Sequence, residues 1–125
     1  VSLIEIRDSI DAGEMYVQRE IPYEFPTRGL ALHNKLLQAC TDLFVESWPA
    51  ICAGEIRAIP QVGPITLHTR KQTNRDRCIS IEDERGELAF LERVLAHDFG
   101  PNTTVQIEHS GRKYKLTLNL EEITA

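Results

Sequence analysis

The stretch VQIEHSGRKYKLTLNL, residues 105–120, decides how the sequence is interpreted. Apolar side chains at Val105 and Ile107 alternate with polar ones up to Ser110-Gly111, and the alternation resumes after that pair. A period of two is typical of a strand with one buried face. Glycine readily adopts the positive φ that a two-residue hairpin turn requires. The stretch therefore predicts an antiparallel hairpin with its turn at residues 110–111.

Working back along the chain, helical spacing from Glu87 to Phe99 predicts a helix that ends before Gly100-Pro101. Alternating apolar residues at 65–67 and at 79–81 flank a polar stretch, which predicts a hairpin with a long tip at about residues 70–76. Residues 28–47 carry a broad apolar stripe at helical spacing, with a break expected at Pro49. A second short helix is expected within residues 50–59.

The N-terminal region carries two further signals. Ser2 and Glu5 have the spacing of a capping box, and Gly13 can close a turn, so residues 2–12 are predicted to form a short helix. From Met15 to Phe25 apolar and polar residues alternate, which predicts a strand whose length Pro22 limits.

These elements predict the α+β class. After the N-terminal helix and without the last strand, their order is β-α-β-β-α-β, the ferredoxin-like order with an antiparallel sheet. The sequence thus predicts a ferredoxin-like fold with an extra N-terminal helix and a C-terminal strand, and other α+β sandwiches with the same elements stay open. The length of 125 residues fits a single domain over 1–125.

Composition restricts the function classes. The formal net charge is −5, which argues against a uniformly basic nucleic-acid binder. No apolar run approaches the roughly 20 residues that cross a bilayer, so no membrane partner is expected. The three cysteines, Cys40, Cys52 and Cys78, form no CxxC pair and are interpreted as small buried residues. This interpretation favours a reducing compartment, and hence the cytoplasm.

Positive charge is concentrated in two places, the stretch 68–77 and the second hairpin, while the rest of the chain is acidic. Such segregation can steer an anionic partner, although exposed cations also simply keep strand edges from pairing. In the ferredoxin-like arrangement these two places would lie at opposite ends of a polar open sheet face. The candidate partner-binding or nucleic-acid-binding residues are His68, Arg70, Lys71, Arg75, Arg77, Lys113 and Lys115.

The sequence shows no phosphate-binding glycine motif, no nucleophile elbow and no metal-like histidine spacing. The acidic run Glu82–Glu84, with Glu87, is interpreted as a helix start rather than a Mg²⁺ site. His97 is placed in the last helical turn, where a cation is favourable, and Trp48 is interpreted as a core anchor. No catalytic residue, metal or cofactor is therefore assigned.

Three function hypotheses follow. The first is a non-enzymatic, intracellular binding or regulatory module that acts through protein–protein contacts, with a homodimer as one form of partnership. The second is a nucleic-acid-binding accessory protein that uses the basic hairpin tip, in which case affinity would fall steeply with salt. The third is an enzyme with an unrecognised site, which a pocket enclosing a shifted titratable group would support.

Overall fold

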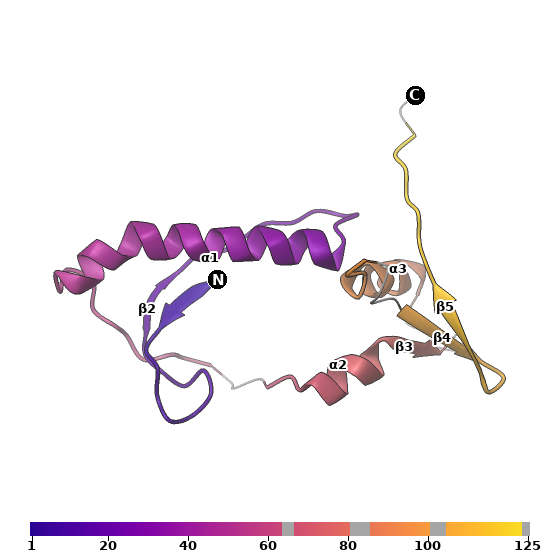
Figure 1. Cartoon of the computed structure of the whole chain (residues 1–125), viewed down its shortest axis with the longest axis horizontal. Coiled ribbons are helices and arrows are strands. Elements are labelled where there is room, and N and C mark those ends of the chain that lie inside the picture. Colours follow the sequence, from indigo (N-terminus) through magenta and orange to yellow (C-terminus); the bar gives the residue numbers. More distant parts are fainter. Residues whose placement is uncertain (64–66, 81–85, 101–104, 124–125) are drawn as a thin grey trace. The chain divides into compact units, whose positions relative to one another are not determined.

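The computed structural model describes residues 1–63, 67–80, 86–100 and 105–123 (Figure 1). In these ranges the chain is a mixed α/β structure with three helices and two sheets, which confirms the predicted mixture of helices and strands. In chain order the elements are β1 (Ser2–Ile4), β2 (Met15–Gln18), α1 (Gly29–Cys52), α2 (Arg70–Asp76), β3 (Cys78–Ser80), α3 (Glu87–Ala96), β4 (Val105–His109) and β5 (Arg112–Leu116).

The chain divides into two compact units. The first unit comprises Val1–Pro22 and His33–Thr66, and the second comprises Tyr23–Leu32 and Leu67–Ala125. The boundary falls inside α1, so the first turn of this helix belongs to the second unit. The assignment of residues 1–125 to a single domain stays a prediction.

In the first unit β1 and β2 pair in antiparallel fashion, with Leu3 opposite Val17. The predicted helix over residues 2–12 is therefore wrong. The Ser2 and Glu5 spacing suggested a helix start, but Ser2 pairs with Gln18 across the ladder. The strand predicted from Met15 is confirmed only as far as Gln18, and a bridge from Met15 to Ile59 continues the pairing on its other side.

The long helix α1 confirms the predicted helix and extends it. Ala39, Leu43 and Ser47, spaced four residues apart, are buried along one face. The break expected at Pro49 is absent, since the helix continues to Cys52 with Pro49 inside it. Trp48 is half-exposed and stacks on Phe44 with ring centroids 5.1 Å apart, so its interpretation as a core anchor is wrong.

Two other expectations fail on the same helix. Cys40 and Cys52 are exposed rather than buried, because they lie away from the buried face of α1, and Cys78 is half-buried. The second short helix expected within residues 50–59 is also wrong, since those residues supply only the end of α1 and then a turn that leads to the bridge at Ile59.

The second unit is built on the sheet β3-β4-β5. The β4–β5 hairpin confirms the antiparallel hairpin that was predicted with its turn at residues 110–111. Ser110 and Gly111 both have positive φ, and Ile107 lies opposite Tyr114. Strands β3 and β4 are parallel, because α3 connects them, so the expectation of an antiparallel sheet is wrong for this pair. Ile79, Val94 and Val105 form the buried cluster between α3 and the sheet, with Phe90, Leu116 and Leu118 packed against it.

The predicted hairpin tip at residues 70–76 is helix α2. The Thr69 hydroxyl accepts a hydrogen bond from the Gln72 amide, and the Gln72 side chain accepts one from the Thr69 amide. This capping box fixes the helix start and leaves no strand there. Outside the described residues lie Ile65, Thr66 and Ile81 of the predicted hairpin, together with Glu82–Glu84.

The exact ferredoxin-like order is not confirmed, because the predicted tip of the central hairpin is helix α2 and the predicted extra N-terminal helix is a strand. The mixed class and the last β-α-β-β segment of the expected order are present. No helix in the described part of the chain combines the length and the apolar character needed to cross a membrane.

Candidate functional sites

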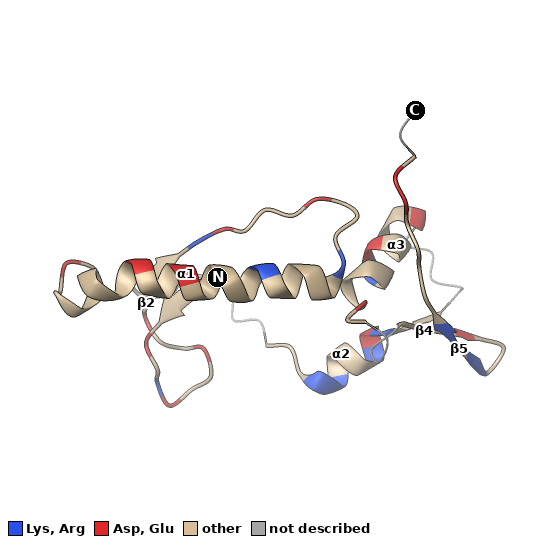
Figure 2. Ribbon diagram, turned by 45° about the horizontal axis from the view of Figure 1, so that its top comes forward, with Lys and Arg blue, Asp and Glu red and all other residues tan. Residues whose placement is uncertain are grey.

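The predicted binding residues lie in the second unit, on α2 and β5. Arg70, Lys71 and Arg75 are exposed on α2, and Arg77 caps its C-terminus half-buried. His68, just before the helix, and Lys113 and Lys115 on β5 are also exposed. The cations that the prediction placed on a hairpin tip are thus displayed on a short helix and its C-cap, whereas Lys113 and Lys115 lie on β5 of the second predicted hairpin (Figure 2).

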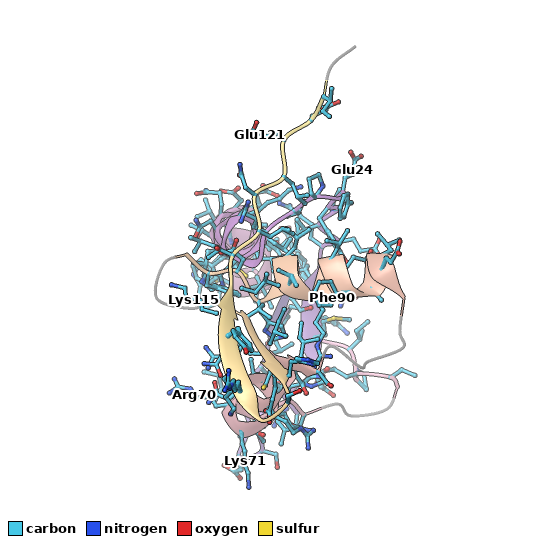
Figure 3. The ribbon with its side chains drawn as sticks, turned by 90° about the vertical axis from the view of Figure 1, so that its right-hand side faces the viewer. Glu24, Arg70, Lys71, Phe90, Lys115 and Glu121 are labelled. Carbon is cyan, nitrogen blue, oxygen red and sulfur yellow. The ribbon has the colours of Figure 1, made fainter. Side chains whose placement is uncertain are left out.

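The sheet of the second unit has one polar face, as expected. Directly opposite residues on paired strands point to the same side. Register therefore places Cys78, Gln106 and Lys115 in one row and Ser80, Glu108 and Lys113 in the next. The core residues Ile79 and Val105 and the half-buried Ile107 have the opposite parity. In Figure 3, Lys115 and Arg70 project on the side of the sheet away from Phe90.

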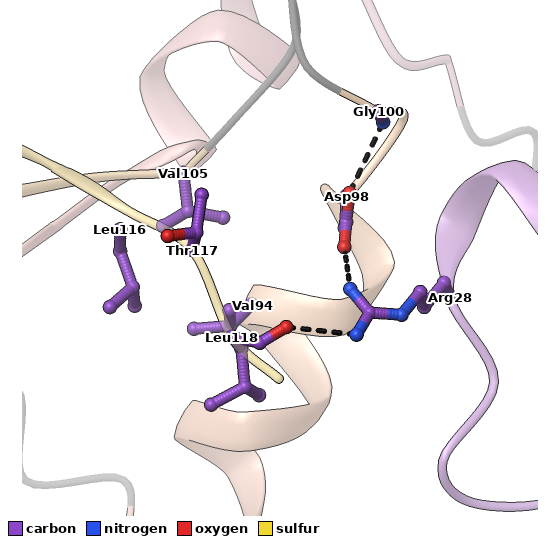
Figure 4. A pocket seen from close by; sticks show the side chains of 8 residues that line it. All are labelled: Arg28, Val94, Asp98, Gly100, Val105, Leu116, Thr117 and Leu118. Carbon is purple, nitrogen blue, oxygen red and sulfur yellow. Dashed lines mark hydrogen bonds and ion pairs between the residues drawn. The ribbon is translucent and has the colours of Figure 1, made fainter. Parts of the chain in front are cut away.

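A cavity of about 210 Å³ lies at the other side of this unit, at the edge of its core (Figure 4). Arg28 forms an ion pair with Asp98 and donates a second hydrogen bond to the Leu118 carbonyl oxygen (2.8 Å). The Asp98 carboxylate also accepts a hydrogen bond from the Gly100 amide (3.1 Å). The charged groups of the cavity are therefore already partnered. The lining residues are Arg28, Val94, Asp98, Gly100, Val105, Leu116, Thr117 and Leu118.

The loop between β1 and β2 carries the most constrained backbone of the first unit. Asp11 has φ of 52°, in the left-handed region that residues other than glycine seldom adopt. The Gln61 side-chain amide donates to the carbonyl oxygens of Asp11 (2.9 Å) and Gly13 (2.5 Å), which fixes both ends of this turn. A Cβ on Gly13 would lie 1.8 Å from the Glu5 carbonyl oxygen, so only glycine fits there.

Carboxylates surround this loop. Arg7 forms an ion pair with Glu5, and the Tyr16 hydroxyl donates to the same carboxylate (3.1 Å). That hydrogen bond to Glu5 raises the pKa of the Tyr16 hydroxyl above its usual value. Asp11 lies exposed at the turn. Because this segment was predicted to be a helix, the turn was missed, although the Asp-Ala-Gly sequence of residues 11–13 is a turn signal.

Two further observations concern metal ligands and the ends of α3. Within the described ranges, no group of three or more His, Cys, Asp or Glu side chains is arranged to hold a metal ion. Glu87 lies in the first turn of α3, as the helix-start interpretation predicts. His97 caps the C-terminus of α3, yet burial and the nearby Arg93 lower its pKa. This shift is opposite in direction to the favourable cation expected at the helix terminus.

Comparison with curated proteins finds methionyl-tRNA formyltransferases. The one from Lactiplantibacillus plantarum is 38% identical over 61 residues, which is 49% of this chain and 19% of that protein. The one from Kosmotoga olearia is 28% identical over 107 residues, which is 86% of this chain and 34% of that protein. The chain thus spans at most about a third of the length of these relatives. No family model matches the sequence.

Comparison with solved structures finds other formyltransferases. The Mycobacterium tuberculosis protein Rv3404c, for which a sugar N-formyltransferase activity has been suggested, superposes with a TM-score of 0.82 at 25% identity, covering 99% of this chain and 54% of that one. A 4-N formyltransferase from Francisella tularensis shares the fold with a TM-score of 0.85 at 15% identity, covering 98% of this chain and 51% of that one.

A third structure shares more sequence over a shorter length. It is the formyltransferase PseJ from Anoxybacillus kamchatkensis, solved with UDP-4,6-dideoxy-4-formamido-L-AltNAc and tetrahydrofolate. Its TM-score is 0.56 at 34% identity, covering 59% of this chain and 39% of that one.

These comparisons correct the functional interpretation. The expectation of a non-enzymatic, regulatory binding module is wrong, and so is the expectation that the chain has no enzymatic role, because its relatives and structural neighbours are formyltransferases. Nucleic-acid binding as an accessory function finds no support in them either. The enzymatic role was missed because no short motif recognised in the sequence indicates formyl transfer.

Proposed function

We propose that the chain is part of an enzyme that transfers a formyl group to the amine of a nucleotide-linked sugar. The observation that carries this proposal is the match over 99% of the chain, at 25% identity, to Rv3404c. The match to PseJ, whose bound ligands are a formamido sugar nucleotide and tetrahydrofolate, supports the same acceptor class. A formylated tetrahydrofolate is then the proposed donor.

Methionyl-tRNA is the alternative acceptor, because the curated relatives act on it by name. The formal charge of −5 favours the smaller substrate, since a large polyanion is usually bound by a protein with a positive balance. A cytoplasmic location follows from this proposal rather than from any contact in the structure. A protein partner and a homodimer also stay predictions.

Formyl transfer to an amine forms a C–N bond at the formyl carbon, breaks the bond between that carbon and the donor nitrogen, and releases a proton from the attacking amine. A carboxylate near the acceptor can take that proton, and the donor nitrogen is protonated as it leaves. We assign the first role to Asp11. It lies in the constrained turn held by Gln61, and backbone strain of this kind is concentrated at functional sites.

The test uses the purified protein at its natural length, a formylated tetrahydrofolate and a UDP-linked 4-amino sugar. The expected result is a product heavier by one CO group, detected by mass spectrometry. A second reaction replaces the sugar with methionyl-tRNA. Formylation of the tRNA alone would move the acceptor to the alternative class, and formylation of neither substrate would overturn the proposal.

Asp11→Asn tests the assignment of the base. We expect kcat to fall by about 10²-fold or more with KM little changed, which is the usual range for loss of a general base. Asp8→Asn in the same exposed loop is the matched control and should keep the wild-type kcat. If both variants keep wild-type kcat, the role of Asp11 is wrong while the reaction class stands.

A further inference from the structure

The second unit carries an excess of positive charge on one surface. We define the basic surface as Arg70, Lys71, Arg75, Arg77, Lys113 and Lys115. Only two carboxylates, Asp76 and Glu108, belong to the segments that form it, α2 with its C-cap and the strands β3–β5. Because the whole chain has a formal charge of −5, this surface is positive against an acidic background.

The elements of the basic surface are connected by backbone hydrogen bonds. The Gln106 amide donates to the Arg77 carbonyl oxygen (3.0 Å), so the end of α2 continues the β3–β4 ladder. Gln106 in turn lies opposite Lys115 on β5. Lys115 is therefore separated from β3 by two strand spacings, about 10 Å. The backbone thus places Lys115 two strands from the C-terminal end of α2.

Among the described residues, carboxylates neutralise little of the charge on Arg70, Lys71, Arg75 and Arg77. Arg75 approaches Asp76 at 3.8 Å, and both side chains are largely exposed, so the pair is weak. Arg77 donates to the neutral Asn74 side chain (2.7 Å) instead of a carboxylate. Glu108 lies opposite Lys113 and also accepts from the Cys78 thiol (3.6 Å). Among the described residues, no ion pair involves Arg70 or Lys71.

We propose that the basic surface binds the diphosphate group of the nucleotide-linked acceptor. This inference rests on the proposed function, since it assigns that substrate's anionic part to named residues. Lysine and arginine are the usual phosphate ligands, and their field raises the local concentration of an anionic substrate. The residues assigned to the diphosphate all belong to the second unit.

A polynucleotide fits this surface less well. Single-stranded nucleic acids are bound by stacking bases on aromatic side chains beside a basic groove. The polar sheet face offers Cys78, Ser80, Gln106, Glu108, Lys113 and Lys115, with no aromatic residue among them. Tyr114 has the parity of the core residues and belongs to the opposite face. The surface therefore provides charge without a stacking platform, which suits a short diphosphate.

The experiment measures UDP binding to the full protein by calorimetry and by amide chemical shifts. UDP and inorganic pyrophosphate are expected to shift the amides of residues 70–77 and 112–116, whereas uridine is not. Binding should weaken as salt is added. Lys113→Gln/Lys115→Gln is expected to weaken UDP binding by about tenfold or more. Arg70→Gln/Lys71→Gln is a second variant on a different element and should weaken it in the same direction.

Lys35→Gln/Arg57→Gln removes the same charge from exposed positions of the first unit and is the matched control, with unchanged binding expected. An unchanged UDP affinity in both surface variants would overturn the proposal. A single-stranded RNA that binds much more tightly than UDP would also overturn it. If formyl transfer to the sugar nucleotide occurs but its KM is unchanged in the surface variants, only this inference fails. If no formyl transfer occurs while UDP binds as expected, only the proposed function fails.

Discussion

The two units differ in how they are stabilised. In the second unit, Ile79 and Val105 are each 1% exposed and pack against α3, so that sheet has a buried core of its own. In the first unit, α1 leaves Leu37, Val45 and Trp48 between 49% and 65% exposed. The stability of the second unit therefore depends on a few side chains in a small core. Each of them contributes more to the free energy of unfolding than any single apolar side chain on the exposed part of α1.

The first unit depends more on backbone contacts. The Val1 ammonium donates to the Arg19 carbonyl oxygen (2.8 Å), and the Met15 and Ile59 backbones exchange two hydrogen bonds of 2.8 and 2.9 Å. The approach of Gly13 to the Glu5 carbonyl closes the loop. Substitutions that alter the backbone should thus weaken the first unit, and substitutions that shrink side chains should weaken the second.

The largest effect is expected from Ile79→Ala in the core of the second unit. Truncation of a buried Ile costs about 2–5 kcal/mol, because the transfer free energy is lost and a cavity remains. Urea unfolding with hydrogen exchange at the β3–β5 amides measures the loss. Leu37→Ala, at a half-exposed position of α1, is the control and should cost within about 0.5 kcal/mol. Equal losses in the two variants would refute the comparison between the units.

A smaller effect is expected from Gly13→Ala in the first unit. The new Cβ would meet the Glu5 carbonyl oxygen, so the loop must shift, at a cost of about 1–3 kcal/mol. Hydrogen exchange should show faster opening at β1 and β2 with the β4–β5 amides unchanged. Ser9→Ala, exposed in the same loop, should leave both regions as in the wild type. Protection lost equally in both units would show that they unfold together.

The sequence predicted those elements whose cause is local. The β4–β5 hairpin was predictable because Ser110-Gly111 supplies both positive φ values within the turn itself. Helix α2 was also locally encoded by Thr69 and Gln72, but its polar composition obscured that signal. The N-terminal strand could not be found, because its pairing with β2 and the contact at Gly13 join residues that local spacing does not relate.

The candidate sites were predictable only in part. Lys113 and Lys115 lie on a polar sheet face as alternation predicted, because strand parity is a local property. Asp11 was missed as a candidate base because its assignment rests on a backbone conformation. That conformation is held by a hydrogen bond from Gln61, fifty residues away in the sequence. The chemistry was missed because none of these residues forms a short motif, and only similarity along the chain connects it to formyltransferases.

The smallest effect concerns pH and again separates the units. Burial, reinforced by the positive charge of Arg93, lowers the pKa of His97 below 6.5, although Asp76 opposes the shift. The unfolded chain then binds more protons than the folded one between the two pKa values, so stability rises with pH through that window and falls on acidification. His97→Gln should remove this part of the pH dependence, measured by urea unfolding between pH 5 and pH 7 (about the range in which histidine titrates). A slope unchanged in His97→Gln would mean that the imidazole is protonated as readily in the folded chain as in the unfolded one.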